Sequence, residues 1–189
     1  HINQALDVAT EYFMPNIAIS MTQAFLHRLL HALVGMAAGA DKALPIVDGL
    51  LIVMSRLTRV LKVDLDNGRV LVEPGVTNAS VSAAVGPHFF YPPDPSSQIV
   101  CTIGGNVAEN SGGLRGLKYG VTRDYVLGLE AVLASGEVVW LGNKCVKDVA
   151  GYNLRDLFIG SEGTLGIVTR VLLKVLPKPA ARRTLLATF

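Results

Sequence analysis

The sequence has 189 residues, half of them hydrophobic, and a formal net charge of +2 at pH 7. A chain of this size can bury a core of its own, and its mixed charges exclude a nucleic-acid-binding surface, which needs a clustered basic face. Cys101 and Cys145 are the only cysteines, too few for a disulfide framework or a cysteine-rich metal site. We expect Cys101 to be a buried free thiol and the protein to be cytoplasmic or peripheral to the membrane.

The N-terminal part contains one helix-like segment. Apolar residues recur at helical spacing over residues 21–38, which predicts an amphipathic helix. The apolar stretch at residues 24–40 includes two histidines and an arginine and is short for a membrane span, so we predict neither a transmembrane segment nor a signal peptide. Because the sequence begins with His1 and not with methionine, we expect a processed, trimmed or incomplete product.

The later elements are predicted from strand alternation, turn residues and helix caps. In chain order they are a strand at residues 50–54, a hairpin at 60–76 that turns at 66–68, a helix from Thr77 or Asn78 to about Val85, an extended proline-rich loop at 92–95, a hairpin at 126–141, a short helix at 154–159 and a strand at 165–176. This mixture predicts an α+β fold in two subdomains divided near residues 75–95, and not a doubly wound parallel sheet.

Two segments are unusually rich in glycine. The first, from Pro92 to Gly120, contains two Gly-Gly pairs, and the second is the GSEGTLG run from Gly160 to Gly166. Glycine is typical of positions with positive φ or close backbone approach, and glycine-rich turns can point peptide N–H groups at an anion. The alternative is that these glycines only make tight turns. Two such segments beside strands favour a long anionic cofactor, although the Walker and Rossmann motifs are absent.

Four motifs carry a resemblance to a known family. DPSSQ, TIGGNVAENSGG, KYG and LFIGSEGTLGIVT, in this order, resemble the FAD-binding domain of the vanillyl-alcohol-oxidase (PCMH) type, especially in the catalytic subunit of glycolate oxidase and in FAD-linked D-lactate dehydrogenases. The resemblance is dense from about Leu50 to Phe189. It implies a two-subdomain α+β fold with FAD extended between the subdomains. The FAD-binding domain would span residues 1–178, diverged up to about residue 49, with 179–189 beginning a linker to a missing C-terminal substrate or cap domain.

The resemblance also implies where FAD binds. The segment from Gly104 to Gly113 would lie along the pyrophosphate and flavin ring, and the turn from Glu162 to Ile167 would hold the adenine and ribose. No catalytic side chain and no metal ligand are implied in this chain, since the flavin carries the redox chemistry. The implied cofactor-binding residues are Pro74, Gly75, Pro93, Asp94, Ser97, Thr102, Ile103, Gly104, Gly105, Asn106, Asn110, Gly112, Gly113, Tyr119, Gly120, Glu162, Gly163, Thr164, Gly166 and Ile167.

Three polar residues leave two interpretations open, and a fourth has one. His88 is a catalytic base or, in the more frequent case, a structural histidine. Asp94 makes an Asx turn or belongs to a loop that borders the flavin, which we favour. Lys118 neutralises a phosphate or is an exposed surface lysine. Glu162 is expected to be structural, with the following residues supplying N–H contacts.

The sequence departs from the resembled family at residues 31–45. Members of the family carry a further glycine-rich pyrophosphate loop there, whereas this sequence reads HALVGMAAGADKALP. The abrupt loss of similarity suggests a reading-frame disturbance or a decayed gene, and it predicts weak FAD binding.

The resemblance implies a flavin-dependent oxidoreductase that converts glycolate or D-lactate to the 2-oxoacid, with further glycolate oxidase subunits as partners. The alternatives are a D-2-hydroxyglutarate dehydrogenase, an alkyl-glycerone-phosphate synthase, or a non-catalytic remnant or binding module with weak FAD affinity. The substrate-binding residues of the family lie in the missing domain, so this chain alone is expected to be inactive.

Overall fold

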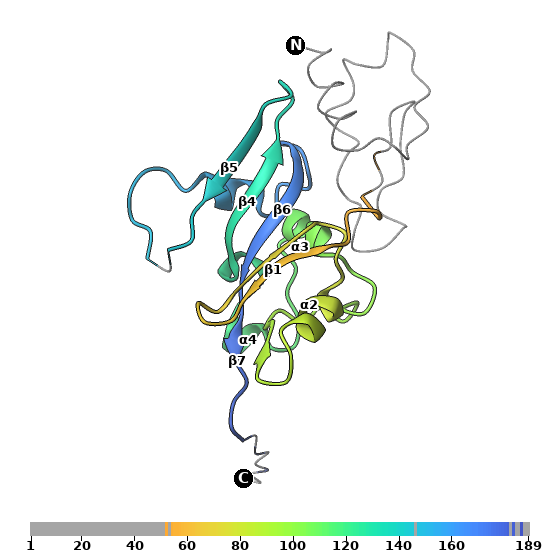
Figure 1. The fold of residues 1–189 in the computed structure, drawn as a ribbon, viewed down its shortest axis with the longest axis vertical. Helices are drawn as coiled ribbons and strands as arrows, with labels where there is room; N and C mark the ends of the chain where they lie inside the picture. Colours follow the sequence, from red (N-terminus) through yellow and green to blue (C-terminus); the bar gives the residue numbers. More distant parts are fainter. Residues whose placement is uncertain (1–51, 53, 146, 182, 184–185, 187–189) are drawn as a thin grey trace.

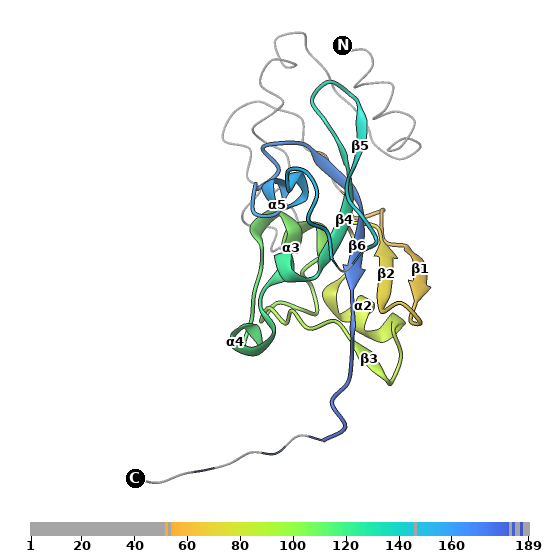
Figure 2. The same cartoon turned by 90° about the vertical axis from the view of Figure 1, so that its left-hand side faces the viewer.

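The computed structural model describes residues 52, 54–145, 147–181, 183 and 186 (Figure 1). Within them, five strands form one sheet in the order β1-β2-β6-β4-β5, and two short strands form a separate ribbon. All the pairings in the described sheet are antiparallel, which confirms the α+β prediction. In Figure 2, α3, α4 and α5 lie on the same side of β4 and β6.

The first predicted hairpin is confirmed. Strands β1 (Val60–Asp64) and β2 (Arg69–Val72) are antiparallel partners. The turn is closed by a hydrogen bond of 3.1 Å from the Gly68 amide to the Leu65 carbonyl. Gly68 has a φ of +62°, a conformation that glycine adopts without strain. Local turn chemistry therefore fixes the register of this hairpin.

The second hairpin consists of β4 (Val126–Val132) and β5 (Val138–Gly142), also as predicted. Strand β6 (Ile167–Lys174) lies between the two hairpins and pairs with both β2 and β4. The division expected near residues 75–95 is therefore wrong for these strands, because β6 joins both hairpins into one sheet. Nothing in the local pattern of either hairpin specifies this shared partner.

The core lies between the sheet and the helices. Strands β2, β4 and β6 contribute fully buried apolar side chains to it, and burial of each contributes about 1.5–3 kcal/mol. The cluster includes Val70, Val72, Val76, Val81, Ile103, Val107, Leu129, Val171 and Leu173. Helix α3 packs against β6, and α5 packs against β5. The sheet thus supports α3 through its contact with β6.

Helix α2 (Asn78–Ala84) begins where the sequence predicts it. Thr77 is its N-cap, and the Thr77 side chain accepts a hydrogen bond from the Ser80 amide. Helix α3 (Ile103–Glu109) was not predicted, since its first Gly-Gly pair suggested a loop. The Thr102 cap and burial of the apolar face outweigh the cost of glycine in a helix, about 1 kcal/mol per residue.

The remaining elements are short. Helix α5 (Leu154–Phe158) was predicted, and Gly160, at a φ of +86°, follows its C-cap. The predicted strand at residues 165–176 is confirmed by β6 and β7 (Leu176–Pro177). Three further elements were missed: β3 (Phe89–Phe90), α4 (Gly116–Tyr119) and the 3-10 turn η3 (Thr122–Asp124). Strand β3 pairs with β7.

Several predictions fall outside the described residues. These are the helix at 21–38 and the glycine-poor segment at 31–45. Of the strand expected at 50–54, only Ile52 and Met54 are described, and neither is in a strand. The proline-rich loop at 92–95 is irregular, as predicted. No helix among the described residues combines the length and apolar character needed to cross a membrane.

Candidate cofactor-binding site

The first Gly-Gly pair, Gly104-Gly105, lies in the first turn of α3, where the backbone packs against other parts of the protein. The Ile103 amide donates to the Val76 carbonyl and the Gly104 amide donates to the Pro74 carbonyl, both at 2.8 Å. A Cβ on Gly104 would lie 2.7 Å from the Pro74 Cβ. The structure thus brings together the predicted site residues of this region. Their amides satisfy protein carbonyls, however, so the expectation that they point at an anion is wrong for the start of α3.

The neighbouring turn is equally close-packed. A Cβ on Gly75 would lie 2.6 Å from the Met54 carbonyl oxygen, and the Gly75 amide donates to the Leu57 carbonyl at 2.7 Å. The Gly105 amide points toward the Thr102 hydroxyl at 3.5 Å, and Gly105 itself is buried. Gly75 and Gly104 thus serve close backbone approach, one of the two uses of glycine that the sequence suggested.

A buried pair of amides connects α2, α3 and the proline-rich loop. The Asn106 Nδ2 donates to Asn78 Oδ1 at 3.1 Å, and the Asn78 Nδ2 donates to the Pro93 carbonyl at 3.0 Å. Asn106 has no exposed surface, and its Oδ1 has no hydrogen-bond partner among the described residues. Its side chain therefore helps to hold the loop, and a contact of Asn106 with the cofactor stays a prediction.

The loop is held on its other side by an ion pair. Asp94 accepts a hydrogen bond from the Arg115 amide at 2.9 Å, and its second oxygen lies 3.2 Å from the Arg115 Nε. A Cβ on Gly113 would overlap the Asp94 carbonyl group. Both carboxylate oxygens thus bind Arg115 and not the backbone that follows Asp94, so the Asx-turn interpretation is wrong. The carbonyl of Ser97, predicted beside it, accepts hydrogen bonds from the amides of Val100 and Cys101.

Residues 111–114, which we call the first glycine segment, follow α3 and remain accessible. Gly112, Gly113 and Leu114 are exposed, and among the described residues no acceptor binds their amides. The segment follows directly after Asn110, the C-cap of α3, which has a left-handed φ of 51°. These N–H groups are the type of donor that binds a phosphate or a flavin carbonyl.

The chain then turns back through two further predicted residues. The Tyr125 hydroxyl donates to the Tyr119 carbonyl at 2.7 Å. Gly120 has a φ of +85°, and a Cβ there would overlap the Asp124 carboxylate. Both residues thus shape the return of the chain from α4 to β4.

Residues 160–165, the second glycine segment, are attached to the C-terminal end of α3. The Gly160 amide donates to the Val107 carbonyl and the Glu162 amide to the Ala108 carbonyl, both at 2.9 Å. Glu162 and Gly163 have positive φ, at 51° and +74°. The exposed side chain of Glu162 makes no hydrogen bond or ion pair among the described residues, so Glu162 is held through its backbone.

The end of this segment leads into β6. Thr164 is exposed, and its hydroxyl donates to the Ser161 carbonyl at 2.7 Å. A Cβ on Gly166 would lie 2.7 Å from the Val132 carbonyl oxygen, so Gly166 lets the turn approach β4. Ile167, the first residue of β6, pairs with Val132.

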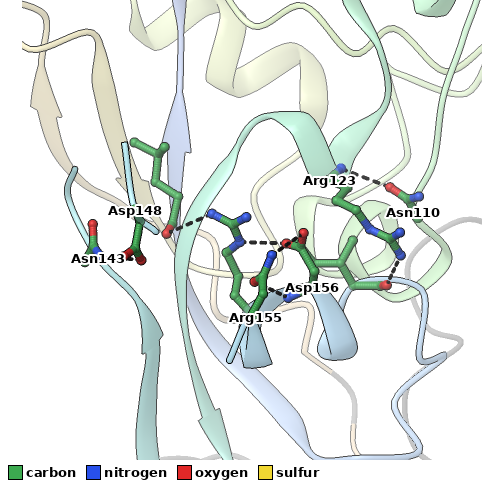
Figure 3. Close-up of polar contacts among 9 residues, drawn as sticks. Asn110, Arg123, Asn143, Asp148, Arg155 and Asp156 are labelled. Carbon is green, nitrogen blue, oxygen red and sulfur yellow. Dashed lines mark hydrogen bonds and ion pairs between the residues drawn. The ribbon is translucent and has the colours of Figure 1, made fainter. Parts of the chain in front are cut away.

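Both glycine segments therefore lie at the same end of α3, the first as its continuation and the second through hydrogen bonds. Arg123 joins them, since its amide donates to Asn110 Oδ1 and its Nη2 donates to the Ile159 carbonyl, both at 2.9 Å (Figure 3). Sequence reasoning missed Asn78, Arg115 and Arg123. Their partners are 13 to 36 residues away in sequence, and no spacing rule signals such contacts.

Two titratable residues that the sequence left with two interpretations lie at the surface. His88 and Lys118 are exposed, and the Lys118 Nζ lies 5.2 Å from the centroid of the Tyr119 ring. Burial raises the pKa of the Tyr91 phenol above its usual range, and burial also raises the pKa of Tyr125. Both phenols are therefore neutral at ordinary pH.

A family comparison decides between the possible anionic cofactors. The family described as FAD binding domain matches residues 32–142, more than half of the chain. The chain belongs to this FAD-binding family. The matched range includes α3 and the first glycine segment, and it begins inside residues 31–45, where the sequence departs from the expected glycine loop.

Known proteins extend the likeness beyond this range. The chain is 54% identical over 146 residues to glycolate oxidase subunit GlcD of Bacillus subtilis (strain 168), covering 77% of this chain and 31% of that protein. It is 44% identical over 146 residues to a D-lactate dehydrogenase of Anaerostipes hadrus, covering 77% of this chain and 30% of that protein. A solved alkyldihydroxyacetonephosphate synthase matches with a TM-score of 0.68 and 27% identity, covering 79% of this chain and 28% of that one. The chain thus spans about a third of the length of these relatives.

The described residues fit FAD at the two glycine segments. FAD carries a diphosphate, which needs several N–H donors. The exposed amides at residues 112–114 supply such donors, while the first turn of α3 has none to spare. In this FAD-binding family member, Gly104 packs against Pro74, whereas Gly112 and Gly113 are exposed and their amides have no acceptor among the described residues.

Proposed function

We propose that this chain is the FAD-binding part of a flavin-dependent 2-hydroxyacid oxidoreductase that acts on glycolate or D-lactate. The curated relatives named glycolate oxidase subunit and D-lactate dehydrogenase support this substrate class. One observation carries the binding role: the first glycine segment follows the C-terminal end of α3, and the second is hydrogen-bonded to that same end. A single extended ligand can therefore touch both.

Within this proposal the chain binds and orients the cofactor through its backbone. The amides at 112–114 hold one part of FAD, and the turn at 163–165 holds another. Pro93 and Asp94 border the flavin and are kept in place by Asn78 and Arg115. Bound FAD supplies the chemistry of accepting a hydride from the carbon that bears the 2-hydroxyl group.

The partners and the location are part of the same proposal. We propose assembly with other subunits of a glycolate oxidase complex, and a cytoplasmic place that allows peripheral contact with the membrane. Both cysteines are free thiols, and Cys145 is exposed, which suits a reducing compartment.

An FAD titration of the purified 189-residue chain tests the binding role. We expect quenching of FAD fluorescence that saturates, and displacement of FAD by ADP, because the phosphates bind to backbone donors. Absence of saturable binding would favour the alternative of a non-catalytic remnant. Substrate class is tested separately, by adding glycolate, D-lactate or D-2-hydroxyglutarate to the flavin-loaded chain joined to the remaining domains of a GlcD relative.

A further inference from the structure

Arg123 occupies the point where the two glycine segments separate. Its amide binds the side chain of Asn110, the residue that ends α3 and precedes the first glycine segment. Its guanidinium binds the carbonyl of Ile159, the residue that ends α5 and precedes the second glycine segment. One residue thus contacts the starting points of both segments.

Both contacts are made at turning points of the backbone. Asn110 has a φ of 51° and Gly160 has a φ of +86°, so each lies in the left-handed region where the chain changes direction. The Arg123 Nη2 lies 3.6 Å from the position that a Cβ on Gly160 would occupy. The guanidinium therefore packs directly over the second turn and limits how that turn can move.

The guanidinium of Arg123 is not paired with a carboxylate in the described part of the chain. Among the described residues, none of the ion pairs involves Arg123, and Asp124 beside it accepts a hydrogen bond from the Val121 amide instead. The guanidinium thus binds a carbonyl at the C-terminal end of α5, where a positive charge is favourable. A charged donor makes a stronger hydrogen bond than a neutral one.

We propose that Arg123 is a positioning residue that sets the spacing of the two glycine segments and thereby the affinity for FAD. The proposal rests on the proposed function of the two segments. Arg123 acts through Asn110 and Ile159 and does not itself contact the cofactor. Loss of its guanidinium would let the second segment move away from the first, so that a ligand held by both would lose contacts with one of them.

The test compares Arg123→Gln with Arg123→Lys and with Arg155→Gln in the 189-residue chain. Arg155 is a matched control because it also binds a backbone carbonyl, that of Leu127, and pairs with Asp156 (Figure 3). The Arg155 side chain bonds to neither Asn110 nor Ile159. Only the Arg155 carbonyl accepts a hydrogen bond from the Ile159 amide, and a change of side chain leaves that backbone bond in place. Each variant is measured for FAD dissociation constant, for the circular dichroism of bound flavin and for thermal midpoint.

We expect Arg123→Gln to raise the FAD dissociation constant about tenfold, as expected for loss of one charge-assisted hydrogen bond, and to change the flavin dichroism. Arg123→Lys should restore most of the affinity, since an ammonium group also donates to the Ile159 carbonyl. Arg155→Gln should leave affinity and dichroism unchanged even if it lowers the thermal midpoint. Equal losses of affinity in Arg123→Gln and Arg155→Gln, or no loss in Arg123→Gln, would overturn the proposal.

A second measurement does not depend on the cofactor. Hydrogen exchange at the Gly160 and Glu162 amides reports on the attachment of the second segment to α3. Arg123→Gln should accelerate this exchange relative to Arg155→Gln, and unchanged exchange would contradict a positioning role. If the unmodified chain binds no FAD, the proposed function fails, while the exchange measurement still decides whether Arg123 fixes the segment.

Discussion

The side chain of Asn106 donates a hydrogen bond of 3.1 Å to Asn78, and both residues are almost completely buried. The Asn78 side chain in turn donates a hydrogen bond to the Pro93 carbonyl. The pair thus connects the first turn of α2 to α3 and to the loop that the proposed function places beside the flavin. A buried amide pair of this kind is costly to break because its partners have no access to water.

Replacement of Asn78 by alanine should therefore destabilise the fold. It leaves the Pro93 carbonyl and the Asn106 amide without partners, and we expect a loss of about 2–4 kcal/mol in the free energy of unfolding. Urea denaturation measures this loss. Asn67→Ala is the control, since Asn67 bonds Asp64 at the surface and should cost less than about 0.5 kcal/mol. Similar losses in the two variants would show that the buried pair has no special role.

Alanine scanning of two glycines should separate internal packing from open surface. Gly104→Ala places a Cβ 2.7 Å from the Pro74 Cβ, and we expect a loss of about 1–3 kcal/mol from overpacking. Gly116→Ala, at a position with no atom within 4 Å, should gain up to about 1 kcal/mol from helix propensity. Midpoints of urea unfolding provide the comparison. A stable Gly104→Ala variant would contradict the close approach of α3 to the Pro74 turn.

The stability of the protein should fall in alkali because of Tyr91. Burial raises the pKa of this phenol in the folded state above its unfolded value of about 10. The unfolded state therefore releases the proton first, so the contribution is complete below about pH 10 and is lost as the pH rises above it. Tyr91→Phe should make unfolding less sensitive to pH in this range, and should cost little at pH 7 because the hydroxyl has no partner among the described residues.

Tyr152→Phe is the control for this titration, because Tyr152 is 95% exposed. Thermal midpoints measured between about pH 8 and pH 11 should have the same slope in Tyr152→Phe as in the unmodified chain. If the slope in Tyr91→Phe equals that of the unmodified chain, groups other than Tyr91 cause the loss of stability in alkali.

A glycine-rich loop in place of residues 31–43 should strengthen FAD binding. If two charge-assisted hydrogen bonds to phosphate are regained, affinity should rise by roughly two to four powers of ten. The FAD titration measures the change, and a loop of equal length with alanines in place of the glycines is the control. Tight FAD binding by the unmodified chain would show that the glycines of this loop are dispensable.

Local patterns predicted the elements whose stability is local. The hairpin turn at Gly68 and the Thr77 cap are specified by residues within four positions of each other. Helix α3 was missed because two glycines at its start lower its propensity, whereas burial of Ile103 and Val107 against the sheet stabilises it. Helix propensity does not include that tertiary contribution.

The candidate site shows the same limit. The glycine content correctly drew attention to residues 104–113, and the family match supports FAD as the cofactor. Composition could not distinguish Gly104, whose amide donates to the Pro74 carbonyl, from Gly112, whose amide has no acceptor among the described residues. Only the fold shows which of these amides is bonded inside the protein and which is an accessible donor.

The central place of β6 has a consequence for synthesis on the ribosome. Val72 and Val126, from the two hairpins, pair with Val171 and Leu173 of β6, near the end of the sequence. Until β6 has emerged, both hairpins expose an unpaired edge to other nascent chains. Such distant pairing also slows folding, because a long loop must close first. A ribosome that stops before Ile167 would therefore release a product prone to aggregation, while one that stops after Lys174 would not.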